Sequence, residues 1–241
     1  MKIIKKFLPG ILPLLLIVGC SQKPIDETTL IEKDGVMYLP DSDKPYTGQV
    51  FTNYSSGEKE YQGRYENGLL VQYSYLNKDG SIKEPVNAET LIERGGNLFE
   101  MNGQKPYTGE FFQLYPNGNR QFSGLLKGGK RYGLQTIWYE NGNKKSEGIV
   151  KDGKRNGLWT WYFEDGRKAL ESHHKDGKWE GLRTSWYQNG QKQLEGTWKE
   201  DKEDGLHIEW YENGQKEREV TFKDGKEISK EQWNEDGSVK E

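Results

Sequence analysis

Histidine is the residue type in this sequence best suited to proton transfer or metal binding, and the chain has three of them. His173 and His174 are adjacent, and His207 follows much later. The segment around the pair has the pattern of a strand, and neighbouring residues of a strand point to opposite faces of the sheet. The pair therefore cannot serve one metal ion, and we expect neither a metal site nor a cofactor.

Motifs that carry catalysis are missing from the sequence. It has no glycine-rich phosphate loop, no His-Glu-x-x-His and no Gly-x-Ser-x-Gly. Carboxylates do occur in pairs, but they recur at a fixed period, whereas an active site is a departure from a repeat. We expect a protein that is not an enzyme.

Aromatic side chains are better candidates for function, because exposed tryptophan and tyrosine anchor many protein interfaces. Three tryptophans lie close together in residues 159–179. In the same stretch, His173 and His174 stand where the preceding unit has Ile149 and Val150. Local packing is the plainer explanation of such a cluster. The residues predicted to contact a partner are Trp159, Trp161, His173, Trp179, Tyr187 and Tyr211.

The one cysteine, Cys20, ends a segment typical of export. Three lysines precede an apolar stretch (7–18) that is shorter than the roughly 20 residues a membrane span needs. The stretch ends Ile17-Val18-Gly19-Cys20, which resembles the lipobox of bacterial lipoproteins. This resemblance implies cleavage before Cys20 and acylation of its thiol by diacylglycerol, with palmitate among the chains. An ordinary cleaved signal peptide and an uncleaved anchor are the alternatives.

Several acyl chains would hold the protein on a membrane far better than one chain does. The lipobox therefore implies a location in the bacterial cell envelope. Ser21, rather than aspartate, follows the cysteine. If the host has two membranes, this residue implies the outer one.

Composition and charge narrow the kinds of partner. Hydrophobic residues make up 32% and the mean hydropathy is −1.01, which is low for a globular core, but regularly spaced aromatics (12%) argue against disorder. Residues 1–19 carry three lysines and no acid, so the rest of the chain has 32 basic and 38 acidic side chains, a net charge of −6. Because the lysines alternate with acids, we expect no nucleic-acid partner.

The elements that must position these residues recur every 24 residues. The ten residues from Gly133 to Gly142 return at 157–166, 181–190 and 205–214, and a weaker copy starts at Gly109. Within each block, residues of one kind recur at every second position, and this period of two is typical of a strand. Such a period predicts stacked units that bury their apolar faces against one another.

Two turns make each unit a hairpin. Asn141-Gly142 follows the first strand directly and predicts a type I′ turn, and Asp152-Gly153 provides a second turn. We expect an all-β fold, an elongated single-layer antiparallel sheet of tandem 24-residue β-hairpin repeats. The column that begins with Leu134, Thr136 and Trp138 is expected to form its core face.

The unit resembles the MORN-type repeat of bacteria and, among such proteins, the YwqK-type antitoxin family. The resemblance rests on Trp-Tyr-x-Asn-Gly blocks (138–142, 186–190, 210–214), on Lys-Asp-Gly-Lys turns (151–154, 175–178, 223–226) and on the Gly-Leu pairs that follow. It covers residues 109–237 well and 48–80 loosely. It implies an antitoxin or immunity role, in which the repeat surface binds and neutralises a toxin.

A second duplication, offset by 61 residues, divides the chain. Residues 44–48 match 105–109 at this offset. The ends match separately, since 77–84 resemble 234–241, so two arrays follow one another and each has similar caps. The expected divisions are a lipoprotein signal peptide (1–19), a lipidated N-terminus and tether (20–29), a short capped array (30–84), a linker (85–90) and a long array (91–241).

These features together predict a protein-binding module held on a membrane by the lipid on Cys20, with a toxin or an envelope protein as its partner. One alternative is a binder of cell wall or polysaccharide, because regularly spaced aromatic rings can stack on sugars. Another is a structural envelope protein that associates with itself.

Overall fold

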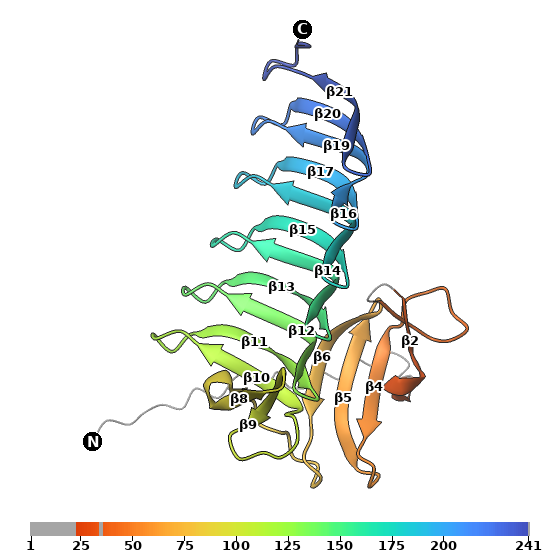
Figure 1. The fold of residues 1–241 in the computed structure, drawn as a ribbon, viewed down its shortest axis with the longest axis vertical. Helices are drawn as coiled ribbons and strands as arrows, with labels where there is room; N and C mark the ends of the chain where they lie inside the picture. The colour runs from red at the N-terminus through yellow and green to blue at the C-terminus, as the bar shows by residue number, and fades with distance from the viewer. Residues whose placement is uncertain (1–22, 34–35, 241) are drawn as a thin grey trace.

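The computed structural model describes residues 23–33 and 36–240, which are almost wholly β-structure (Figure 1). Thirteen strands form one long sheet, four form a smaller first sheet, and two further hairpins stand apart. The expected fold class, an elongated antiparallel sheet of hairpin repeats, is confirmed. Within these ranges no helix has the length and apolar character to cross a membrane. Cys20 and the expected signal peptide lie outside the described residues.

The long sheet contains the periodic part of the chain. Its strands, in spatial order, are β7 (Val86–Asn87), β10 (Gly109–Leu114), β11 (Arg120–Lys127), β12 (Lys130–Trp138), β13 (Lys144–Lys151), β14 (Lys154–Tyr162), β15 (Lys168–Lys175), β16 (Lys178–Trp186), β17 (Lys192–Lys199), β19 (Gly205–Trp210), β20 (Lys216–Lys223) and β21 (Lys226–Gln232), with β18 (Lys202–Glu203) beside β17.

The first sheet and the small hairpins come from the N-terminal part. The first sheet contains β1 (Ile25–Asp26), β4 (Gly48–Asn53), β5 (Lys59–Glu66) and β6 (Leu69–Tyr75). The hairpins are β2 (Ile31–Lys33) with β3 (Val36–Tyr38), and β8 (Leu91–Arg94) with β9 (Asn97–Glu100). Two short 3-10 turns are η1 (Glu27–Thr29) and η2 (Ala88–Thr90).

Each sheet begins with the same cap, and here the expected divisions need correction. β1 pairs in parallel with β4, and β7 pairs in parallel with β10. Residues 25–29, expected within the tether, therefore form β1 and η1, and residues 86–90, expected as a linker, form β7 and η2. Tyr46 then donates its hydroxyl to the carbonyl of Gln49 (3.0 Å), as Tyr107 does to Glu110 (2.9 Å).

The Asn-Gly turns are not of type I′, contrary to the expectation. Gly142 has a positive φ of 90° but Asn141 does not. The Gly142 amide donates to the Tyr139 carbonyl at 3.0 Å, which is a type I turn followed by a glycine bulge. The reason is the side chain of Asn141, whose Oδ1 accepts from the Asn143 amide at 2.9 Å and so favours an ordinary backbone conformation.

The type I′ turns lie at the other end of each hairpin. Asp152 and Gly153 have φ of 49° and 79°, and Asp176-Gly177 and Asp224-Gly225 follow the same pattern. Successive turns of this kind are bonded to the preceding hairpin, because the Gly153 amide donates to the Arg131 carbonyl at 3.0 Å. The two edges of the sheet thus carry different turn types.

The column expected to form the core face of the long sheet is buried only in part, since Thr136 and Thr184 are 7% and 6% exposed. Leu182 and Leu206, in the expected core column, are 45% and 48% exposed, whereas Trp159 on the other face is 3% exposed. We call the face that carries Trp159 the inner face and the face that carries Leu182 the outer face.

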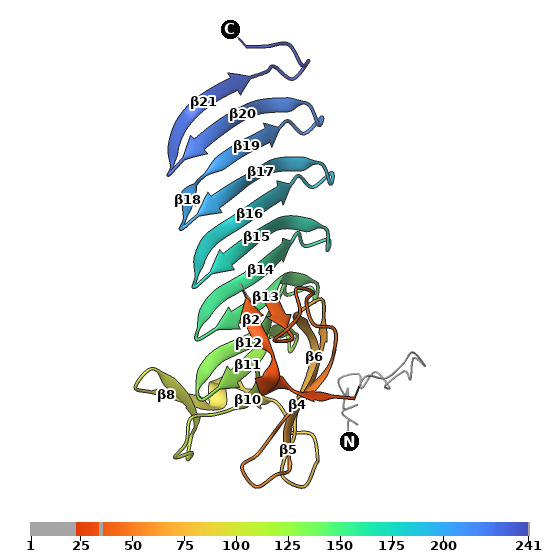
Figure 2. The ribbon, with the colours of Figure 1, turned by 90° about the vertical axis from the view of Figure 1, so that its right-hand side faces the viewer.

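A column of small residues explains why the inner face is the more deeply buried one. Gly148 pairs with Trp159 across the ladder, and a Cβ atom at this glycine would overlap the indole ring. Gly124, Ser172 and Gly196 occupy the equivalent positions in neighbouring units. Large side chains can therefore lie flat across these strands, which bend along their length (Figure 2).

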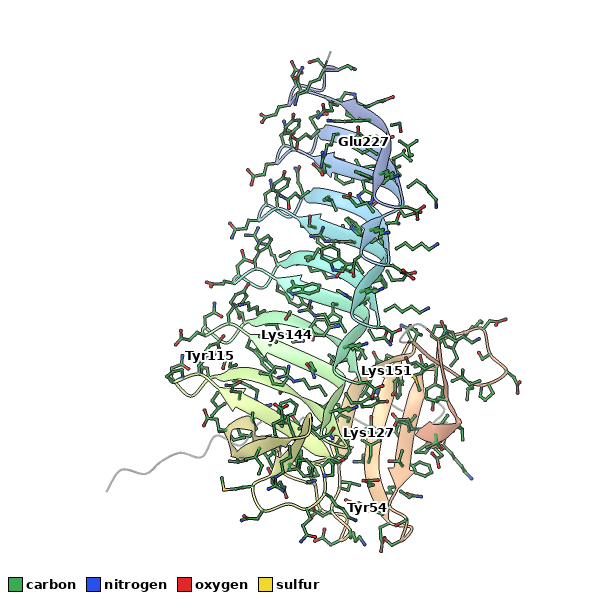
Figure 3. The ribbon with its side chains drawn as sticks, in the orientation of Figure 1. Tyr54, Tyr115, Lys127, Lys144, Lys151 and Glu227 are labelled. Carbon is green, nitrogen blue, oxygen red and sulfur yellow. The ribbon has the colours of Figure 1, made fainter. Side chains whose placement is uncertain are left out.

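The first sheet packs beside the long sheet instead of continuing it (Figures 1 and 2). Leu125 from the outer face of β11 is buried with Tyr61 and Leu70 of the first sheet. Glu32 accepts hydrogen bonds from Lys151 Nζ (2.9 Å) and Asn156 Nδ2 (3.1 Å). Figure 3 shows Lys151 on the side of the long sheet next to the first sheet. The two arrays therefore form one packed body at the base of the long sheet.

Candidate functional site

The structure places the six predicted partner-binding residues at three separate locations. Trp159, Trp161 and Trp179 lie on the inner face, and His173 lies exposed on the outer face. Tyr187 and Tyr211 lie at the edge formed by the Asn-Gly turns, where Figure 3 labels their counterpart Tyr115. These residues therefore do not form one surface.

Trp159 has a structural role, because its side chain is almost completely buried. Its ring packs over Gly148, and its indole Nε1 donates to the Ile149 carbonyl at 2.8 Å. A ring this deeply buried supports the sheet and has little surface left for a partner. Trp161 and Trp179 are only half-buried, so they stay candidates for direct contact.

The adjacent histidines lie on opposite faces, as expected. His174 is 4% exposed on the inner face, and its Nε2 lies 2.8 Å from Ser172 Oγ. Burial, followed by the positive charge of Arg155, lowers the pKa of His174 to about 4, so the ring is neutral at pH 7. Ser172 is 1% exposed, so no substrate could reach this pair. No cluster of three metal-ligating side chains occurs in the part of the chain that the structure describes.

Tyr187 and Tyr211 use their hydroxyl groups to link successive units. Tyr187 donates to the carbonyl of Trp210 at 2.8 Å, and Tyr211 donates to that of Trp233 at 2.9 Å. Their rings are half-buried. The same bond recurs at Tyr115 and Tyr139, so it is a feature of the scaffold, and these tyrosines stabilise the array.

The inner face carries three arginines that the sequence reasoning did not single out. Each guanidinium lies within 6 Å of two aromatic ring centroids. The distances are 5.9 and 4.9 Å from Arg131 to Phe111 and Phe122, 4.7 and 5.2 Å from Arg155 to Trp159 and Trp161, and 4.9 and 5.2 Å from Arg183 to Trp179 and Trp198. Guanidinium groups held over ring faces in this way gain cation–π attraction.

These arginines have no acceptors. In the described residues, none of the three guanidiniums makes a hydrogen bond or an ion pair, and the Nε of Arg183 is buried without a partner. Gln135, 3% exposed on the same face, also has a buried Nε2 without a partner. Burial lowers the pKa of Arg131, Arg155 and Arg183, yet arginine stays charged at any physiological pH.

Unpaired buried donors are unusual, because leaving such a group without an acceptor costs about 1–3 kcal/mol. Here three buried side-chain nitrogens without a partner share the inner face: Gln135 Nε2, His174 Nδ1 and Arg183 Nε. Arg131 and Arg155 are exposed residues of the same face. A sequence signal for these two arginines existed, since they occupy the same position in consecutive units. We define the inner-face site as Arg131, Gln135, Arg155 and Arg183 with the rings around them.

The repeats that form this face can be named. Four consecutive segments match the MORN repeat variant: residues 131–152, 155–176, 179–200 and 203–224. The expected MORN-type repeat is thus confirmed for this stretch. No curated protein matches the chain. The inner-face site lies within the first three of these MORN repeats.

Hairpins outside the matched segments share the geometry of the MORN repeats. The Gly118 amide donates to the Tyr115 carbonyl at 2.9 Å, and the Gly57 amide donates to the Tyr54 carbonyl at the same distance. Both hairpins therefore close with the turn that the matched repeats use. The structure extends the repeat architecture to β10–β11 and to β4–β5.

A further hollow lies elsewhere, on the first sheet. It has a volume of about 210 Å³, and Gln49, Phe51, Gln62 and Gln72 are among its lining residues. Its charged lining residues are all basic, and one of them, Arg64, already pairs with Glu66 at 3.0 Å. Its lining residues include no carboxylate, histidine or cysteine, so the hollow offers no pair for acid–base chemistry.

Proposed function

We propose that the chain is a membrane-anchored MORN-repeat protein, without catalytic activity, that binds another protein through the inner-face site. MORN repeats are generally modules that bind proteins or membranes. The observation that carries the proposal is the set of buried donors that lack acceptors on one face. A partner that supplies those acceptors recovers the free energy that the isolated chain forgoes.

The lipobox-like sequence supports anchoring through Cys20, which would hold the binding face in the cell envelope. The similarity to YwqK-type antitoxins suggests the finer role of an immunity protein that neutralises a toxin. A lipid anchor suits a toxin encountered in the envelope better than one that acts in the cytoplasm. An envelope protein that is not a toxin is the other partner of this class.

Glycan binding is less well supported by the arrangement of the outer-face rings. Stacking on a sugar needs an open aromatic face. Lys192 Nζ lies 5.8 Å from the ring centroid of Trp210, and Lys216 Nζ lies 5.6 Å from that of Trp233. These lysine stems cover rings that a sugar would need.

Self-association through the free edge of the long sheet is also disfavoured. The last strand, β21, carries Lys226, Glu227 and Lys230. Charged side chains on an edge strand oppose the addition of another strand. A structural role through edge-to-edge contacts would therefore need a different surface.

The test is capture of a partner by the full chain, purified in detergent, from envelope and secreted fractions of its own host. We expect one stoichiometric protein, identified by mass spectrometry. Capture of glycan fragments with no protein would contradict the proposal and favour wall binding. Concentration-dependent oligomers with no other partner would favour the structural role.

The anchor has a separate test. Cys20→Ser should abolish incorporation of labelled palmitate and release the protein from the membrane fraction. A Ser21→Ala variant, one residue away, is the matched control and should keep both. Unchanged labelling of Cys20→Ser would show that this cysteine is not the acylated residue.

A further inference from the structure

We propose that the inner face between β12 and β17 binds an acidic segment of a partner protein that lies in the polyproline II conformation with a carboxylate at every third residue. The inference deepens the protein-binding function proposed above and rests on it.

Charge identifies the chemistry of the segment. The inner face of β12 to β17 carries Arg131, Arg155 and Arg183 and no acidic side chain, by the registers of these strands. The lysines of the outer face differ, because Lys144 pairs with Glu147 and Lys192 with Glu195. The protein thus neutralises its outer face internally and leaves the inner face positive.

Guanidinium geometry identifies the acceptor. Aromatic rings contact the flat faces of the guanidinium group, whereas its N–H donors point outward in the plane of the group. Those edges are free at all three arginines in the described structure. A carboxylate accepts two parallel hydrogen bonds from such an edge, and this pairing is among the strongest available in proteins.

Spacing identifies the conformation. Arg131 and Arg155 are equivalent positions two strands apart, a separation of about 10 Å. Arg183 extends over Trp179, which holds the position equivalent to Arg155 in the next unit. Arg183 thus supplies a third guanidinium one unit further along the sheet axis, reaching from the middle of β16 towards the position that Arg131 and Arg155 occupy in their strands.

A polyproline II segment matches that step. Its rise of about 3.1 Å per residue and three residues per turn return every third side chain to the same side after about 9.3 Å. Residues on one side of an extended strand are only about 6.8 Å apart, so a strand cannot meet successive arginines in register. The structure thus favours acids at every third position.

The site has defined ends. On one side, the cap residues Leu91 and Leu98 pack against Phe111 and Phe122 and cover the start of the inner face. On the other side, acidic residues begin with Glu203, which lies 3.6 Å from His207 Nδ1. Three arginines fit between these limits, so the segment needs three acids, or seven residues.

The probe is a synthetic peptide of five Glu-Pro-Pro triplets, blocked at both ends, titrated into the full chain in detergent. Binding is measured by calorimetry and by the fluorescence of the half-buried Trp161 and Trp179. The peptide is expected to bind, and its affinity should fall as salt is raised. A Lys-Pro-Pro peptide should not bind, and an alternating Glu-Ser peptide with the same number of acids should bind more weakly.

The variants locate the binding. Each of Arg131→Gln, Arg155→Gln and Arg183→Gln should weaken binding by roughly tenfold or more, as expected when a charge-assisted hydrogen bond is lost. The matched control is Lys144→Gln with Lys168→Gln and Lys192→Gln. It removes three positive charges, 24 residues apart, from the outer face, as loss of all three arginines removes three from the inner face, and it should leave the affinity within about twofold. Arginine-to-lysine variants keep the charge, and circular dichroism reports whether each variant is folded.

Three outcomes would overturn the inference. They are equal binding by a folded variant lacking all three arginines, an equal loss in the outer-face control, and tighter binding of a single-stranded oligonucleotide than of the peptide. Failure of the proposed function looks different. In that case arginine-dependent peptide binding would persist, while the host fractions would yield no protein partner. If host-protein capture survives loss of all three arginines, protein binding stands but does not depend on the arginines of the inner-face site, and the acidic-segment inference falls.

Discussion

Replacing Phe163 by tyrosine should stabilise the long sheet. Tyr115, Tyr139 and Tyr187 each donate their hydroxyl at 2.8 Å to a carbonyl 23 residues further along the chain. Phe163 holds the position equivalent to Tyr139 in the next unit and has no hydroxyl. This unit is therefore the one place in the matched repeats where the chain of hydroxyl bonds is interrupted.

The expected gain follows from one added hydrogen bond. A bond of this kind contributes about 0.5–1.5 kcal/mol net, and the neighbouring units show that the geometry accommodates the hydroxyl. For a chain of this size, 1 kcal/mol corresponds to a rise in Tm of about 2–4 °C. Tyr139→Phe removes the equivalent bond and should lower stability by a similar amount.

Thermal unfolding and hydrogen exchange together test the reasoning. Repeat arrays can unfold in parts, so the slowing of amide exchange should concentrate in strands β14 to β17, beside the substituted turn. If Tyr139→Phe destabilises but Phe163→Tyr is neutral, the bond contributes in its own unit but the unit that contains Phe163 cannot form it. If both variants are neutral, the hydroxyl bonds contribute nothing and the reasoning is wrong.

Three further predictions concern buried contacts. Because burial depresses the pKa of His174 to about 4, the folded state resists protonation of this ring. The contribution of the neutral ring to the free energy of unfolding is complete above pH 6.5 and should fall by up to about 3 kcal/mol towards pH 4. Chemical unfolding should detect this loss in the unmodified protein and not in His174→Gln. Gly148→Ala should destabilise by roughly 1–3 kcal/mol, seen as a lower unfolding midpoint and altered fluorescence of Trp159; an unchanged midpoint would show that the ring moves freely. Glu32→Gln should weaken the contact with Lys151 by at most about 1 kcal/mol, because the pair is partly exposed, and protease cleavage between the two arrays should rise; equal cleavage would mean that the apolar contacts alone hold them.

The 24-residue period was sufficient to predict the hairpins, their order and their antiparallel pairing, because each of these depends on local spacing and turn residues. It was not sufficient to predict the turn types. Asn-Gly favours a type I′ turn, but here the side chain of Asn141 bonds to the backbone two residues on and selects a type I turn with a bulge. The residue pair Asn-Gly alone does not show whether such a side-chain hydrogen bond will compete with the type I′ conformation.

The more deeply buried face was not predicted, because alternation separates two faces without saying which one bends inward; of the expected core column, the threonines are buried and Leu182 and Leu206 are exposed. Leu182 looks like a core residue and Arg183 looks like a surface residue, yet the small residues around Gly196 let the arginine side lie inside. The column of small residues was the available signal. It also explains why the arginine site was missed, since its members lie on the face taken to be solvated.

The caps were predicted too short for a simpler reason. Ile25-Asp26 and Val86-Asn87 obey the same 61-residue offset as the matches further along, so the duplication starts before Leu30. The packing of the first sheet on the long one could not be predicted from either array alone. It depends on Leu125 and Lys151 meeting residues more than 50 positions away.

The contact between Glu32 and Lys151 also determines how such a chain can change in length. One unit further along, Lys151 and Asn156 are replaced by Lys175 and Glu180, so sliding the first sheet by one unit would bring Glu32 against another carboxylate. The base is thereby fixed, while units beyond it touch only their neighbours. A gene that gained or lost 72 base pairs downstream of this contact would lengthen or shorten the protein by about 10 Å per unit and leave both ends intact. Length is therefore a property that evolution can adjust here without rebuilding the fold.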